Sequence, residues 1–207
     1  MVYRLICLFL LLPVVTPVLA AGMNDELTEA RNIFLKGVDG DKRAVRTATN
    51  RFRSLSLSHP DEPVYLAYFG ACMTLQGRDV PNNIEKKRVT DEGLAKIDRA
   101  LELNPYREAQ GSAMYLDTLL VAANSFIHIP SFFNRYEKGR QLLTEILQHR
   151  DFEGMAPGFK DATYMAAALV AQGDKDEKAY RRYLDLTVEA DPEGRDGKLA
   201  RKFLEKL

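Results

Sequence analysis

Apolar residues recur through most of the chain at intervals of three and four positions, with polar residues between them. Leu66, Phe69 and Met73 show this spacing clearly. It places the apolar side chains on one side of an α-helix, which then packs against neighbouring helices. The pattern predicts an all-α fold of antiparallel helix pairs, each stacked on the next. The predicted pairs cover about 25–57, 61–105, 112–149 and 159–191, and a single capping helix covers 196–207.

Helix-breaking residues separate these predicted helices. Gly37 to Asp41 has the composition of a turn, and prolines stand at three helix exits, Pro60, Pro105 and Pro192. Proline has no backbone N–H and disfavours helical geometry in the residue before it, so it commonly follows a helix. Asp61 is a candidate N-cap, because its carboxylate can accept a free N–H of the first helical turn.

A polar stretch from Arg78 to Arg88 interrupts the second predicted pair. The helix before it is expected to end near Gly77, and Thr90 is expected to cap the helix after it. We therefore predict a loop of 11 residues here. Long loops inside compact domains often carry function, so two interpretations are open, a solvated excursion or a binding loop. Its candidate partner-binding residues are Arg78, Asn82, Asn83, Lys86, Lys87 and Arg88.

The third predicted pair begins with a helix from Ser112 to His128 that is apolar on nearly every side, with Asp117 as its only charged residue. Such a helix is expected to lie between neighbours. A second helix is predicted from Phe132 to Gln148, and aromatic residues crowd the corner between the two. This corner is either core under the turn or an exposed patch that binds a partner or a second copy. Phe132 and Phe133 are its candidate binding residues.

Small residues precede large ones at a fixed spacing in several of these helices. Gly93 stands four residues before Ile97, and Ala48 stands four before Phe52. Close helix contacts are expected at Ala48, Gly70, Gly93 and Ala179. In this spacing the chain resembles the tetratricopeptide repeat (TPR) family, as an exported bacterial member, over nearly all of its mature length. The interruption after Gly77 departs from the family pattern.

The resemblance implies a short TPR-like superhelix that acts as a scaffold. The first helices of the pairs would line a groove that takes an extended peptide or a helix from a partner. Carried over to the second pair, the groove positions are Val64, Ala67, Ala71, Thr74 and Leu75. They are small or apolar, so a clamp for a C-terminal carboxylate is not expected. A compact bundle that fills its own groove is the alternative.

Residues 1–20 have the pattern of a signal peptide, with a positively charged start, an apolar run from Leu5 to Leu12 and small residues at the end. We predict cleavage after Ala20 or Ala21, which leaves a helical-repeat domain over 21–207. A retained membrane anchor is the alternative, but two prolines interrupt the run. The predicted location is periplasmic or secreted, without stable membrane insertion after cleavage.

The charges of the chain balance. Its 207 residues include 29 basic and 29 acidic ones, for a formal net charge of zero. This balance gives no electrostatic reason to expect nucleic-acid binding. The second predicted helix is nonetheless basic, with Arg43, Arg46, Arg51 and Arg53. It is either a solvated face or a site for an anionic partner.

No local motif for catalysis or ligand binding is present. His59, His128 and His149 stand far apart, and Cys72, the remaining cysteine of the predicted mature chain, is expected to be a buried, inert thiol. The sequence predicts no catalytic residue, no cofactor and no metal. It predicts a non-catalytic periplasmic scaffold or adaptor for a protein or peptide partner, in an envelope or transport complex. The alternatives are a structural, self-associating helical protein and a small-ligand binder or enzyme without a recognisable motif.

Overall fold

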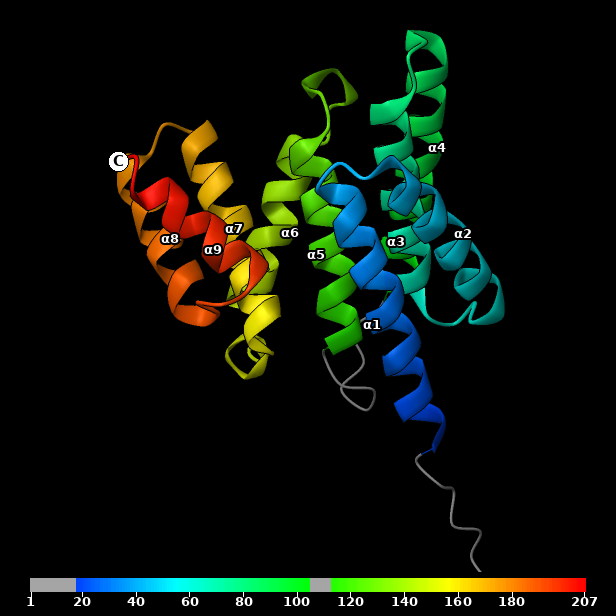
Figure 1. Cartoon of the computed structure of the whole chain (residues 1–207), viewed down its shortest axis with the longest axis horizontal. Helices are drawn as coiled ribbons and strands as arrows, with labels where there is room; N and C mark the ends of the chain where they lie inside the picture. The colour runs from blue at the N-terminus through cyan, green and yellow to red at the C-terminus, as the bar shows by residue number, and fades with distance from the viewer. Residues whose placement is uncertain (1–17, 105–112) are drawn as a thin grey trace, which may run out of the picture.

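The computed structural model describes residues 18–104 and 113–207, with side chains from residue 25 onward. These residues form helices joined by short turns and contain no β-strand, which confirms the predicted all-α fold (Figure 1). The elements are α1 (Val18–Val38), α2 (Lys42–Ser58), α3 (Pro63–Asp79), α4 (Asn83–Glu102), α5 (Ala113–His128), η2 (Ser131–Phe133), α6 (Tyr136–Gln148), η3 (Phe152–Gly154), α7 (Pro157–Gly173), α8 (Glu177–Ala190) and α9 (Arg195–Leu204), where η marks a short 3-10 helix.

Consecutive helices pack as pairs, α1 with α2, α3 with α4, α5 with α6 and α7 with α8. The first helix of each pair also packs against the first helix of the next pair, so that α1, α3, α5 and α7 form a continuous row that α9 extends. Each second helix packs against the first helix of the pair that follows. Figure 1 shows the pairs following one another from α2 at one edge to α8 at the other. This arrangement is the repeat-like stack that the sequence predicts.

The two ends of the stack are joined. Arg195, the first residue of α9, places its Nη2 atom 2.7 Å from Oδ1 of Asp39 in the turn between α1 and α2. The row of first helices therefore curves until its last member reaches its first turn. This contact could not be predicted from the sequence, since the two residues are 156 positions apart.

The first helix begins earlier than predicted. It runs from Val18, so both predicted cleavage positions fall within α1. The rest of the predicted signal peptide, residues 1–17, lies outside the described residues, and its cleavage stays a prediction. In the part of the chain that the structure describes, no helix has the length and apolar character to cross a bilayer.

The prediction of a loop from Arg78 to Arg88 is wrong. Helix α3 continues to Asp79 and α4 already begins at Asn83, so three residues separate the two helices. Asn82 is the cap, because its Oδ1 accepts the N–H groups of Ile84 at 2.9 Å and Glu85 at 3.0 Å. Ion pairs one helical turn apart support this added part of α4: Lys87 with Asp91, and Arg88 with Glu85 and Glu92.

Thr90 is not a cap but a buried residue within α4, 4% exposed. A Cβ atom added to Gly77 would lie 2.2 Å from the Thr90 Oγ1 atom, so these two residues press together across the longer pair. The predicted glycine stop at Gly77 is instead a contact point inside α3.

The predicted close approach at Gly70 and Gly93 is confirmed. A Cβ atom on Gly70 would lie 2.5 Å from the carbonyl oxygen of Gly93, and one on Gly93 would lie 2.7 Å from that of Gly70. No other residue type fits without moving one backbone away from the other. Ala48 is fully buried, while Ala179 is half-buried against the α7–α9 cluster.

The largest core lies between α1, α2, α3, α4 and α5 and contains Phe52, Tyr65, Ile97 and Phe126, all fully buried. A smaller cluster fills the space between α7, α8 and α9. Helix α5 packs against α3, α4, α6 and α7, which confirms its predicted place between neighbours. Its partner α6 begins at Tyr136, four residues later than predicted, because Asn134 adopts a left-handed conformation (φ 55°) that ends η2.

Candidate functional site

The added turns of α3 and α4 meet the corner between α5 and α6. The Lys87 ammonium nitrogen lies 5.9 Å from the centre of the Phe133 ring. In Figure 1 the α3–α4 connection and the α5–α6 corner lie at the same end of the molecule. We call this region the tip surface and define it by Ile84, Lys86, Lys87, Phe132 and Phe133. The structure thus brings together two of the stretches that the sequence singled out separately.

Two large apolar side chains of the tip surface face water. Ile84 is 83% exposed and Phe132 is 63% exposed, whereas Phe133 is half-buried and its ring centre lies 4.3 Å from that of Phe132. Phe126, in the same predicted cluster, is fully buried in the core. The sequence left open whether this corner is core or an exposed patch. The structure shows core at Phe126 and an exposed patch at Phe132.

Ile84 was missed by the sequence analysis. It lies in the first turn of α4, two residues after the Asn82 cap, and is 83% exposed. An isoleucine two residues after a capping asparagine is the available signal. This signal indicates a helix start only if the stretch from Arg78 to Arg88 is helical, whereas the sequence predicts a loop there.

The basic residues of this region are largely neutralised. Arg78 pairs with Asp79 and also donates to the carbonyl oxygens of Gly37 and Val38. The Arg88 guanidinium hydrogen-bonds to Glu85 and lowers the pKa of that carboxyl group. With Lys87 bound to Asp91 as well, the tip surface is apolar in character rather than basic.

The groove positions implied by the resemblance lie mostly inside the protein. Val64 and Ala67 are fully buried and Ala71 is 2% exposed, while Thr74 and Leu75 are half-buried. Their helix, α3, is covered by α1, α2, α4 and α5. A partner could reach the three buried positions only if these helices separated, so partner binding there stays a prediction with no support from their burial.

A buried polar cluster joins three of the first helices. The Arg31 Nε atom of α1 donates to the Tyr68 hydroxyl of α3 at 2.8 Å, and Arg31 Nη2 donates to the Asp117 carboxylate of α5. The Tyr68 hydroxyl donates to Asp117 Oδ1 at 3.3 Å. Burial raises the pKa of Asp117, and the Arg31 charge opposes that rise. The cluster satisfies the only carboxylate of α5 and fixes α1, α3 and α5 relative to one another.

A second carboxyl group is buried near the start of α9. Asp161 of α7 is 3% exposed. Burial, together with the neighbouring Asp196 and Asp191 carboxylates, raises its pKa to about 7. The Asp196 carboxylate is in turn held by Arg195, whose Nη1 lies 2.6 Å away. These groups meet where α7 supports the last helix.

Little else in the described residues has the form of a reactive site. Within residues 25–104 and 113–207, no three His, Cys, Asp or Glu side chains are placed to hold a metal ion. Cys72 is fully buried, and burial raises the pKa of its thiol far above the usual range, so the reactive thiolate is disfavoured. A shallow hollow on the outer side of α6 is open to solvent and lined by polar side chains, among them Glu137, Arg140 and Glu145.

The fold therefore defines an all-α protein of stacked helix pairs with an exposed apolar region at the tip. Comparison with protein-family models, with curated proteins and with solved structures found no match. Membership of the TPR family accordingly stays a prediction.

Proposed function

We propose that the protein is a non-catalytic scaffold of TPR-like type that binds a partner protein in the cell envelope through the tip surface. The observation that carries the proposal is the exposure of Ile84 and Phe132 at the same end of the stack. Large apolar side chains beside polar ones on an otherwise charged surface are typical of protein-binding sites. The signal-peptide pattern of residues 1–20 supports the periplasmic or secreted location.

The rigid placement of these residues also supports binding. Ile84 lies on a capped helix, and Phe132 lies in the short 3-10 helix η2. Helix α5, which precedes η2, is anchored in the core by the buried Phe126. A backbone fixed in this way loses little conformational entropy when a partner covers the exposed side chains. A hydrophobic contact of modest area at the tip, rather than a long groove, is the expected mode of binding.

The proposal is tested by site-specific photocrosslinking in the native cells. A photoreactive phenylalanine analogue at position 132 is expected to give one discrete adduct, and Ile84→Asp in the same chain should abolish it, because a buried carboxylate at the interface costs several kcal/mol. Leu207→Asp is the matched control: Leu207 is 59% exposed, but it follows α9 at the C-terminus, away from the tip (Figure 1). This control should leave the adduct unchanged.

Equal adduct yields with Ile84→Asp and Leu207→Asp would refute a binding role for the tip surface. The mass of the adduct separates the two interpretations of the exposed corner. An adduct of twice the chain mass, together with a dimer in light scattering, supports the self-associating protein instead of the scaffold.

A further inference from the structure

The second helix carries an unusual concentration of positive charge. Helix α2 contains Lys42, Arg43, Arg46, Arg51 and Arg53 and has no acidic residue in its 17 positions. The chain as a whole is neutral. Helix α2 therefore carries a local excess of positive charge that the net charge of the chain does not reveal.

Three of the four exposed cations of α2 lie along one line, and the fourth, Arg43, lies beside it. Ala48 and Phe52 are fully buried and point the apolar side of α2 into the core. The opposite side carries a stripe of exposed residues at helical spacing, which we call the basic ridge: Lys42, Arg46, Asn50, Arg53 and Leu57. At about 1.5 Å per residue the ridge is about 22 Å long.

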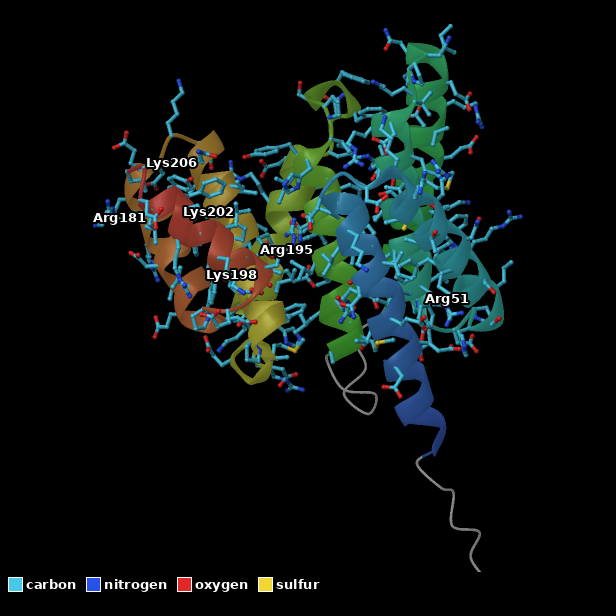
Figure 2. The ribbon with its side chains drawn as sticks, in the orientation of Figure 1. Arg51, Arg181, Arg195, Lys198, Lys202 and Lys206 are labelled. Carbon is cyan, nitrogen blue, oxygen red and sulfur yellow. The ribbon has the colours of Figure 1, made fainter. Side chains whose placement is uncertain are left out.

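The cations of the ridge have no acidic partner in the described residues. Arg51, on the flank of α2, pairs with Glu29 of α1 at 3.2 Å. Lys42, Arg46 and Arg53 form no ion pair in residues 25–104 and 113–207 (Figure 2 shows the side chains around α2). This differs from α4, where Lys87, Arg88 and Arg99 are each paired with a carboxylate. Like charges along one stripe repel one another and are stabilised only by solvent or by an anionic partner.

We propose that the basic ridge is a docking site for an acidic α-helix of a partner protein. The charge complementarity requires an anionic partner, and the narrow, straight ridge fits a rod better than a plane. A flat anionic bilayer pressed against α2 would also compete with Glu29 of the neighbouring helix for Arg51, because Glu29 is 66% exposed and already pairs with that residue. An acidic helix laid along the ridge leaves this ion pair in place. Exposed Leu57 at its end offers an apolar contact that a protein helix can use.

This site is separate from the tip surface, so it does not depend on the proposal above. Helix α2 packs against α1 and α3, whereas the tip surface is built from the α3–α4 connection and the α5–α6 corner. A protein with Ile84→Asp should keep its ridge binding, and failure at one surface can be told from failure at the other.

The test uses purified protein without the predicted signal peptide and a fluorescent, alanine-rich helical peptide as the probe. The peptide carries glutamates one and two turns apart on one face, and a control peptide carries glutamines there. The triple variant Lys42→Gln, Arg46→Gln, Arg53→Gln should weaken binding of the acidic peptide about tenfold, the combined effect expected of three exposed charge pairs. Binding should also weaken as salt is added.

The matched control removes the same charge at the other end of the stack. Arg181→Gln, Lys202→Gln, Lys206→Gln changes three exposed residues of α8 and the C-terminal segment (labelled in Figure 2) that form no ion pair among the described residues. This variant should bind the acidic peptide as the unchanged protein does. Equal losses in the two triple variants would overturn the proposal, because they would indicate attraction by charge anywhere on the surface.

Other partners give distinct results. Ridge-dependent binding to phosphatidylglycerol vesicles or to duplex DNA that is tighter than peptide binding would also overturn the proposal, and so would a dimer that the α2 triple variant dissociates. Circular dichroism of the variants checks that the fold persists, which is expected since all six side chains are exposed.

Discussion

Gly70 allows the most direct test of the fold. Alanine is favoured over glycine in a helix by about 1 kcal/mol, so Gly70→Ala would stabilise an isolated α3. In the protein the added Cβ atom would lie 2.5 Å from the Gly93 carbonyl oxygen and 2.7 Å from the Ile97 Cγ1 atom. The first contact is with backbone, which cannot rotate away. Relief therefore requires α3 and α4 to separate along the most extensive helix contact in the described residues.

Overpacking of this kind costs about 1–3 kcal/mol, and a backbone contact belongs at the upper end of that range. After the gain in helix propensity, we expect Gly70→Ala to lower the free energy of unfolding by about 2 kcal/mol, or the melting temperature by about 4–8 °C for a chain of this size. Urea unfolding followed by circular dichroism measures the change.

Gly158→Ala is the matched control. Gly158 lies in the first turn of α7, and a Cβ atom there would approach only the Asp191 Oδ2 atom, at 3.9 Å. The same substitution should therefore leave stability unchanged or raise it by up to about 1 kcal/mol. If Gly70→Ala proved as stable as the unchanged protein, the contact between the two glycine backbones would be refuted.

Two further predictions concern the buried charges. Arg31→Met should destabilise the protein by about 3–5 kcal/mol at neutral pH, because it leaves the Asp117 carboxylate buried without its cation. Asp117→Leu in the same chain should restore much of the loss. Thermal melts of the single and double variants measure both effects. Asp161, with its pKa raised to about 7 from 3.8, binds more protons in the folded chain than in the unfolded chain between these values, so its contribution to stability is present below about pH 4 and is lost as the pH rises to about 7. Asp161→Asn removes this loss and should be more stable than the unchanged protein by about 1–2 kcal/mol at about pH 8. This figure is below the full linkage value because a neutral amide accepts the Ala162 and Gly197 N–H groups less strongly than the carboxylate does. At about pH 4 the two proteins should unfold alike in urea, and a constant difference across this range would contradict the assignment.

Much of the candidate site could be recognised in the sequence only in pieces. Phe132 and Phe133 were found because aromatic residues cluster at a helix corner, and the stretch from Arg78 to Arg88 was found because it breaks a repeat spacing. Their meeting at the tip depends on how far α3 and α4 extend. That length is set by the Asn82 cap and by ion pairs within α4, which are weak signals individually. From the sequence alone, the same polar residues predict a loop.

The amino-acid sequence by itself determined the helices, their pairing and the close contacts at small residues. Periodicity, prolines and glycines act over a few neighbouring positions, so they can be recognised without coordinates. Only the tertiary structure decided which exposed and buried groups meet. Arg31 reaches Asp117 across 86 positions and Arg195 reaches Asp39 across 156, because the curvature of the stack, summed over every helix contact, brings distant turns together. It also decided that Val64 and Ala67 are core while Ile84 is surface, since a helix pattern shows which side is apolar but not which neighbour covers it.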